Sequence, residues 1–330
     1  MNILYTLNDA FVPQVATSMC SIMENNKSHS SITFFLVHTD ISVKHQQQLV
    51  EFVSTYNRTV EFVQIEDLKT YIDFDFDTNG WSSIVLARLL VDKLLPTSVD
   101  RILYLDGDTL VLGDLKELWN LDLSTKTLAM GPEPTVDVNR RKELELKERA
   151  YHNSGVILMN LKRWRDMDIG KQILQYYKSK DGKLFAPDQD AINGGAIDEI
   201  ITLEPRYNFF NIYTTYPHHT LKKLSGEAQF VSKDVLGNNI KQPLIIHYLG
   251  EERPWRKGNT HKYRKEYLNY LHKTPWKDTP MEEGWELYFI CFRLFNIAMK
   301  PFPMLRYRII NSLIPSFMKF RKRQLQKNQK

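Results

Sequence analysis

The sequence predicts an α/β protein with a mainly parallel sheet, helices on both faces of the sheet, and a C-terminal helical appendage that is basic and aromatic. Short apolar runs alternate with amphipathic segments over about the first 250 residues, and this alternation is typical of a sheet built from strand–helix–strand units. The chain then becomes aromatic and basic, and we divide it into domains at 1–265 and 266–330. With 330 residues, 42% of them hydrophobic and 25% charged, the protein can bury a full globular core.

The individual elements follow from the period of the apolar residues. The runs that predict strands are Ile3 to Leu7, Ile32 to Val37, Val60 to Ile65, Ile102 to Leu105, Thr127 to Met130, Val156 to Met159 and Leu244 to His247. The amphipathic segments that predict helices are Val12 to Glu24, Val43 to Tyr56, Ile84 to Leu94 and Ile169 to Tyr177. Right-handed crossovers place the carboxyl ends of parallel strands on one edge, where ligands of α/β proteins bind.

One predicted strand ends in two carboxylates: the run Ile102 to Leu105 is followed by Asp106-Gly107-Asp108. Two such carboxylates can bind one divalent cation, and Gly107 lets the backbone turn and a ligand approach. The sequence has five Asp-x-Asp triplets, so the spacing alone is weak. The two triplets within Asp73–Asp77 fit a solvated loop, and Asp166/Asp168 precedes a predicted helix. The Asp106/Asp108 pair and Asp188/Asp190, between Pro187 and Gly194, have the context of a site.

The net charge of +5 is unevenly distributed. From Trp285 to Lys330 there are ten Lys or Arg residues and one acid, a net charge of +9, which leaves −4 for residues 1–284. The same segment is rich in aromatic and aliphatic residues, but Arg293 interrupts its most apolar stretch, which is too short to span a membrane. We expect it to lie on an anionic membrane surface, the alternative being a helical pair packed on the body. Lys and Arg residues that cluster at one end of the chain argue against nucleic-acid binding.

The chain shows features of a cytoplasmic protein, and we expect it to be peripheral on the cytoplasmic face of the membrane. Cys20 and Cys291 are too few and too far apart for a disulfide framework. The first residues, Met1 to Leu7, have no basic stretch before their short apolar run, and we interpret them as a strand instead of a secretory signal.

If a divalent cation and a nucleotide diphosphate bind to the protein, four further segments have residue types suited to contact them. Thr6 to Asp9 follows the first strand and would either line a nucleoside site or form a helix cap. Arg88 places one guanidinium on an otherwise apolar face of a predicted helix, where it would either bind a phosphate or extend to the protein surface. Asn153-Ser154-Gly155 would contact sugar hydroxyls or form a turn. His247 ends an apolar strand, as a ligand or as a core histidine.

Taken together in chain order, these segments resemble glycosyltransferase family 8, which includes bacterial lipopolysaccharide galactosyl- and glucosyltransferases and the glycogenins. The resemblance covers residues 1 to about 260. It rests on Asn8-Asp9, Arg88, Leu105 to Asp108, Tyr151 to Gly155, Asn160 to Trp164, Pro187 to Asp190 and His247 to Trp255.

The resemblance implies a GT-A fold and a retaining hexosyltransferase that uses UDP-glucose or UDP-galactose with Mn²⁺ or Mg²⁺. By the family pattern, Asp106, Asp108 and His247 are the cation ligands. Asp188 and Gln189 would stabilise the reacting sugar, and we assign them to the donor site and not to a nucleophile. The residues expected to bind the nucleotide sugar and its cation are Thr6, Asn8, Asp9, Arg88, Asp106, Gly107, Asp108, Asn153, Ser154, Asp188, Gln189, His247, Gly250 and Arg253.

The chain departs from the family pattern at two places. Asn8 stands where many bacterial members have Asp, and its carbonyl can still accept a hydrogen bond from uracil. The sequence Gly250-Glu251-Glu252-Arg253-Pro254-Trp255 replaces Gly-Pro-x-Lys-Pro-Trp, so that Arg253 can bind a phosphate but two acids stand beside it.

The expected acceptor is a saccharide, a lipid-linked glycan or a protein, in cell-surface glycan synthesis. Two other functions use the same features: a membrane-surface protein that binds a sugar nucleotide without turnover, and a phosphotransferase or nucleotidyltransferase that uses the same Asp pair. A phosphatase-type site would need Asp-x-Asp-Gly-Thr near the first strand, and a nucleotidyltransferase a Gly-rich basic loop; the sequence has neither.

Overall fold

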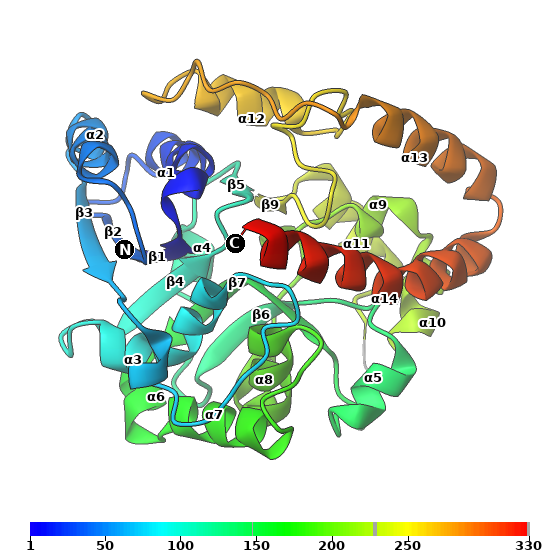
Figure 1. Ribbon diagram of the computed structural model, residues 1–330, viewed down its shortest axis with the longest axis horizontal. Helices are drawn as coiled ribbons and strands as arrows, with labels where there is room; N and C mark the ends of the chain where they lie inside the picture. Colours follow the sequence, from blue (N-terminus) through cyan, green and yellow to red (C-terminus); the bar gives the residue numbers. More distant parts are fainter. Residues whose placement is uncertain (147, 227–229, 329–330) are drawn as a thin grey trace.

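A seven-stranded sheet forms the centre of the computed structural model, which describes residues 1–146, 148–226 and 230–328 (Figure 1). Its strand order is β3-β2-β1-β4-β7-β6-β8. The strands are β1 (Asn2–Leu7), β2 (Thr33–His38), β3 (Thr59–Gln64), β4 (Arg101–Leu105), β6 (Leu128–Pro132), β7 (His152–Asn160) and β8 (Ile200–Thr202). All the predicted strands are present, although the last of them belongs to a different sheet.

The sheet is mainly parallel, as the sequence predicted. Strands β1 to β4 run parallel to one another, and β6 is parallel to β8, whereas β7 is antiparallel to both of its neighbours. The reversed direction of β7 brings its first residues beside the last residues of β4. The backbone N–H of Asp106 accordingly donates to the carbonyl of Gly155 at 2.8 Å.

A second, two-stranded sheet holds the predicted strand near residue 245. Strand β9 (Ile245–His247) pairs antiparallel with β5 (Thr109–Val111), a strand that the sequence did not predict, and Thr109 lies opposite His247. Because β5 follows Asp108 directly, this pairing places His247 next to the two aspartates.

Helices cover both faces of the large sheet. Alternate residues of β1 divide between two core clusters: Ile3 and Tyr5 pack with α1 on one face, and Leu4 packs with η3, α7 and α8 on the other. The α-helices of the body are α1 (Val12–Asn25), α2 (Val43–Ser54), α3 (Val91–Leu94), α4 (Lys116–Trp119), α5 (Val138–Glu143), α6 (Leu161–Asp166), α7 (Ile169–Ser179), α8 (Pro187–Gly195), α9 (Ile212–Thr215), α10 (His218–Leu224) and α11 (Lys233–Lys241).

Short 3₁₀ helices connect several of these elements. One of them is a correction to the prediction, since the segment expected as a helix from Ile84 to Leu94 begins as a 3₁₀ helix and becomes α-helical only at Val91. The side chain of Arg88 donates from Nε to the carbonyl of Val85 at 3.1 Å, within the tighter turn. The 3₁₀ helices are η1 (Asp9–Phe11), η2 (Leu68–Thr70), η3 (Ser83–Leu90), η4 (Ile197–Glu199) and η5 (Pro205–Tyr207).

The C-terminal region is helical, as predicted. Helix α12 (Arg264–Leu271) packs on α1, with Tyr267 buried in the main core. Helices α13 (Glu286–Met299) and α14 (Pro303–Asn328) then form a hairpin along the side of the molecule. The division of the chain into domains at residue 265 stays a prediction. Within the described residues, none of the helices combines the length and apolar character that crossing a membrane requires.

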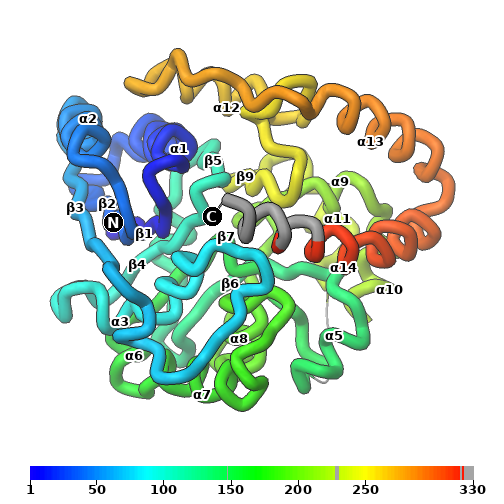
Figure 2. Tube along the Cα trace, viewed as in Figure 1, coloured from blue at the N-terminus to red at the C-terminus, as the bar shows by residue number. Residues whose placement is uncertain are grey.

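Helix α14 runs back toward the middle of the molecule, as the chain trace shows (Figure 2). Nζ of Lys322 lies 2.5 Å from Oδ2 of Asp77. The backbone of Lys322 passes close to Gly80: a Cβ added to Gly80 would lie 3.3 Å from the Cα of Lys322. Gly80 also has φ +82°, which favours glycine. The hairpin therefore contacts the loop that precedes η3.

Candidate active site

A cleft of about 370 Å³ opens beside the carboxyl ends of β1 and β4 and the first residues of β7. Its volume lies within the range of small-molecule sites. Most of the residues predicted to bind the nucleotide sugar line this cleft: Thr6, Asn8, Arg88, Asp106, Gly107, Asp108, Asn153, Ser154, Asp188, Gln189, His247 and Arg253.

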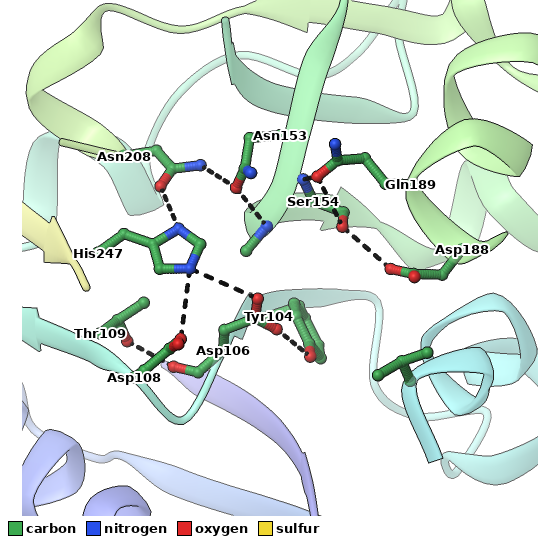
Figure 3. A network of polar contacts seen from close by, with 12 residues as sticks. Tyr104, Asp106, Asp108, Thr109, Asn153, Ser154, Asp188, Gln189, Asn208 and His247 are labelled. Carbon is green, nitrogen blue, oxygen red and sulfur yellow. Dashed lines mark hydrogen bonds and ion pairs between the residues drawn. The ribbon is translucent and has the colours of Figure 1, made fainter. Parts of the chain in front are cut away.

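The three predicted cation ligands converge in this cleft. One carboxylate oxygen of Asp106, one of Asp108 and a nitrogen of His247 all lie within 4.8 Å of one another. The Nε2 atom of His247 is 3.3 Å from Oδ1 of Asp108 and 3.7 Å from Oδ2 of Asp106 (Figure 3). Two carboxylates and an imidazole suit Mn²⁺ or Mg²⁺. The donor set therefore fits the divalent cation that the sequence predicted.

The backbone at Gly155 makes room for the imidazole. A Cβ at this position would lie 2.2 Å from Cε1 of His247 and 2.9 Å from Oδ2 of Asp106. Gly107 has a similar steric role, because a Cβ there would lie 2.7 Å from Val15 and 2.8 Å from Phe11 in the first helical segment. Both glycines are needed for close packing around the ligands.

His247 and Asp108 stabilise each other's charged forms. Burial alone would lower the pKa of His247, but the nearby carboxylates, Asp108 before Asp106, together raise it. Burial would likewise raise the pKa of Asp108, and His247 together with Arg253 lowers it. Without a cation, the imidazole and the carboxylates thus form a charge-compensated cluster.

Asp106 is oriented by two side chains from neighbouring elements. Its Oδ1 accepts a hydrogen bond from the Tyr104 hydroxyl at 2.7 Å and one from Nη2 of Arg88 at 2.9 Å. The Tyr104 hydroxyl is in turn 3.1 Å from Oγ1 of Thr6 at the end of β1. Because Oδ1 is fixed in this way, Oδ2 faces His247 and the cation position.

Arg88 forms ion pairs both with a predicted cation ligand and with Asp188, which was predicted to stabilise the reacting sugar. It is only 3% exposed, and its Nη1 lies 3.2 Å from Oδ2 of Asp188 while Nη2 binds Asp106. Asp188 also accepts a hydrogen bond from the Ser154 hydroxyl at 3.0 Å. Burial raises the pKa of Asp188 in spite of Arg88. One guanidinium therefore positions two carboxylates from different elements, which a planar fork can do.

Gln189 begins a second network with Asn153. Its Oε1 accepts from the backbone N–H of Ser154 at 2.9 Å, and its Nε2 donates to Oε2 of Glu133 at 3.0 Å. Asn153 donates to the same oxygen of Glu133, also at 3.0 Å. The side-chain amides of Asn153 and Gln189 thus converge on one carboxylate.

Two predicted residues do not line the cleft. The carboxylate of Asp9 accepts from the backbone N–H of Ser42 and lies 2.8 Å from Nδ1 of His45, so that it holds the start of α2 instead of facing the cavity. Gly250 lies in the turn after β9 with φ +78° and is likewise outside the lining.

The acids that replace the family pattern after Gly250 have partners of their own. Glu251 pairs with Arg256, and Glu252 accepts from Asn211 at 2.8 Å. Arg253 lines the cleft, with Nη2 at 3.8 Å from Oδ2 of Asp108. The guanidinium of Arg253 is therefore available to bind a phosphate beside the predicted cation ligands.

The sequence interpretation missed several residues of the cleft, among them Glu133, Arg140 and Tyr104. Glu133 and Arg140 line the cavity, and Tyr104 orients Asp106. Glu133 follows directly after β6, at a strand end, and this placement was a usable signal. Tyr104 lies inside an apolar run, where nothing in the sequence distinguishes it from a core residue.

Comparisons with known proteins identify the family of the chain. Residues 2–259 match the model of glycosyl transferase family 8. The chain is 29% identical over 288 residues to a lipopolysaccharide 1,2-glucosyltransferase of Escherichia coli, which covers 84% of this chain and 79% of that protein. It is 25% identical over 280 residues to general stress protein A of Bacillus subtilis, covering 84% of this chain and 94% of that protein.

The fold matches a solved structure of the galactosyltransferase LgtC in complex with donor and acceptor sugar analogues. The TM-score is 0.68 at 20% identity, over 83% of this chain and 96% of that one. This similarity confirms the predicted GT-A fold.

The family match over most of the chain, together with similarity to a glucosyltransferase, identifies the protein as an enzyme that transfers sugar units. The chain belongs to glycosyl transferase family 8. The prediction of a glycosyltransferase is confirmed.

Proposed function

We propose that this protein transfers a hexose, glucose or galactose, from a UDP-sugar to a saccharide acceptor, with Mn²⁺ or Mg²⁺ and with retention of configuration. The observation that carries the proposal is the convergence of Asp106, Asp108 and His247 in a cleft that also contains Arg88 and Arg253. The lipopolysaccharide 1,2-glucosyltransferase of E. coli and the 1,3-galactosyltransferase of Salmonella typhimurium, 23% identical, support a glycan acceptor.

The reaction breaks the bond between the anomeric carbon and the β-phosphate oxygen and forms a bond from an acceptor hydroxyl oxygen to the same carbon. A bound divalent cation supplies Lewis acidity toward the diphosphate that leaves. Arg253, which lies beside Asp108, adds positive charge near the diphosphate. The carboxylate of Asp188 and the amide of Gln189 position the sugar. The hydroxyl proton leaves with a phosphate oxygen or a base of the cleft.

The experiment is a turnover assay with purified protein, Mn²⁺ and either UDP-glucose or UDP-galactose, without acceptor. We expect slow release of UDP, and Asp106→Asn or Asp108→Asn should reduce it on the order of 1,000-fold. Asp114→Asn, an acid outside the cleft, serves as the matched control. Release of UDP that needs no cation, or binding of the donor without any turnover, would contradict the proposal. The second result would instead favour a sugar-nucleotide-binding protein.

We further propose that the hairpin of α13 and α14 binds an anionic membrane surface, so that the enzyme is peripheral on the cytoplasmic face. On α13 the exposed apolar residues recur at helical spacing and form one stripe: Leu287, Ile290, Leu294 and Ile297. Among the side chains of α14 that the structure describes, Leu305, Leu313 and Phe317 are apolar and exposed. Another side of the hairpin contacts the body through Arg306, which donates to the Tyr216 hydroxyl, and Phe289 is buried. An apolar stripe in a segment of net charge +9 fits a bilayer that carries negative charge.

A further inference from the structure

From the hydrogen bonds behind the cation site we infer that Asn208 is a positioning residue: it fixes the ring orientation and the tautomer of His247, so that Nε2 presents a lone pair to the cation. The inference rests on the proposed cation site. It concerns Asn208, which lies on the far side of the imidazole from the cation position and which the family resemblance did not include.

Asn208 is held rigidly beside His247. It is completely buried, and its backbone follows η5 and runs next to β9, where Phe209 donates to Ile245 and His247 donates to Phe209, both at 2.8 Å. On its other side, a Cβ at Gly131 would lie 2.7 Å from Cβ of Asn208. Asn208 is therefore packed on two sides, with its side-chain amide beside the ring of His247.

The amide of Asn208 lies between Nδ1 of His247 and the side-chain amide of Asn153, as Figure 3 shows. Its oxygen is 3.0 Å from Nδ1 of His247, and its Nδ2 donates to Oδ1 of Asn153 at 2.9 Å. A carboxamide has one donor end and one acceptor end. The tautomer of His247 thus depends on which end of Asn208 faces Asn153.

Asn153 is itself fixed from both ends. Its Oδ1 also accepts from the backbone N–H of Gly155 at 2.9 Å, and a backbone N–H can only donate. Its Nδ2 donates to the carboxylate of Glu133, which, when ionised, can only accept. Oδ1 of Asn153 therefore faces Asn208, which has to offer its Nδ2 there and its oxygen to His247.

The proton of the neutral imidazole then belongs on Nδ1, where it is donated to Asn208. The other nitrogen, Nε2, points at Asp106 and Asp108 with its lone pair. The opposite tautomer would direct an N–H at the cation and would bind no metal. Partners of this kind behind a histidine ligand commonly contribute 10- to 100-fold in metal affinity.

The same carboxylate also sets the orientation of Gln189. Because Nε2 of Gln189 donates to Glu133, its Oε1 is directed to the N–H of Ser154. One network of hydrogen bonds therefore fixes both the histidine ligand and the predicted donor-site glutamine. Asn153, predicted to contact the donor sugar, has both ends of its amide in this network.

The test measures binding of Mn²⁺ alone, without donor, by the electron paramagnetic resonance signal of free Mn²⁺. Asn208→Leu has a similar side-chain size but no polar atoms, and we expect its Mn²⁺ affinity to fall 10- to 100-fold. Asn208→Asp keeps an acceptor for the Nδ1 proton and should bind Mn²⁺ at least 5-fold more tightly than Asn208→Leu. Asn26→Leu is the matched control, since Asn26 is equally buried and bonds Leu115 far from the cleft.

A second readout separates positioning from a general loss of structure. Nitrogen-15 NMR of labelled histidine, with Mg²⁺ as a diamagnetic cation in place of Mn²⁺, should show the Nδ1-protonated tautomer of His247 in the native protein and in Asn208→Asp. In Asn208→Leu the Nε2-protonated form should appear. Equal Mn²⁺ affinity and an unchanged tautomer in Asn208→Leu would overturn the inference, while native protein that binds no Mn²⁺ would overturn the proposed function instead.

Discussion

Gly155 lies directly against the imidazole of His247, closely enough that a single added methyl group would overlap Cε1 at 2.2 Å. The strand that carries Gly155 runs antiparallel to β4, and this direction brings its first residues to the cation site. The requirement for glycine here comes from packing against a ligand, not from a special backbone conformation.

Gly155→Ala should therefore displace His247 and abolish cation binding. We expect a loss of about 1–3 kcal/mol in the free energy of unfolding from overpacking, with loss of Mn²⁺-dependent UDP release. The control is Gly237→Ala in α11, where a Cβ would meet nothing within 4 Å. That helical substitution should stabilise the protein by about 0.5–1 kcal/mol. Native activity in Gly155→Ala would show that the ring has room to move.

Arg88→Lys should impair both carboxylates that the guanidinium binds. A lysine ammonium cannot reach Asp106 and Asp188 in the same planar geometry. We expect kcat/KM for UDP release to fall on the order of 100-fold, with a loss of about 3 kcal/mol in unfolding free energy. Arg163→Lys, which alters a pair with Glu199 outside the cleft, should leave kcat/KM within about 2-fold. Equal effects of the two variants would contradict this role of Arg88.

His152 should make the protein less stable in acid. Burial lowers its pKa from 6.5 to about 4, and its Nε2 lies 2.8 Å from Oγ1 of Thr202. The unfolded chain thus binds more protons between those two pKa values, so stability decreases as the pH falls from about 6.5 to 4, by roughly 3 kcal/mol for this residue.

Urea unfolding of the native protein and of His152→Asn at pH 7 and pH 5 measures this contribution. The variant should show a smaller decrease in unfolding free energy between the two pH values. It should not abolish the decrease, because burial also lowers the pKa of His261 to about 4. An identical pH dependence in both proteins would exclude His152 as a source.

Acidic residues on the exposed stripe of α13 should release the protein from anionic vesicles. The double variant Leu294→Glu, Ile297→Glu places two charges where apolar side chains are 61% exposed. We expect its affinity for vesicles of phosphatidylcholine with phosphatidylglycerol to fall on the order of 10-fold or more. Val43→Glu, at an exposed apolar residue of α2, is the control for the added charge. Unchanged sedimentation of the double variant with these vesicles would count against membrane binding by α13.

The strands could be predicted because they are short apolar runs of clear period. The Asp106/Asp108 pair could be recognised as a candidate site because the two acids directly follow an apolar strand. The small sheet could not be predicted in the same way. Strand β5 has only three residues, Thr109 to Val111, and its partner lies far along the chain. Periodicity within one segment carries no information on such a pairing.

The residues behind the cation site were missed for a similar reason. Asn208 follows a 3₁₀ helix and lies at no strand end, so that only the fold brings its amide to His247. Asp9 was expected in the cleft because it follows β1, but the start of α2 binds its carboxylate. Proximity to a strand end thus predicts a place near the cleft, while the hydrogen-bond partners decide which way the side chain points.

The pairing of β5 with β9 also determines which parts of the chain are free to vary in length. Thr109 and His247 are kept opposite each other by the local ladder, even if the exposed turn between α4 and β6 changes in length. Lengthening a surface connection costs little entropy. An insertion in that turn would leave the ion-binding triad in register, so the scaffold can change at its surface while its chemistry stays constant.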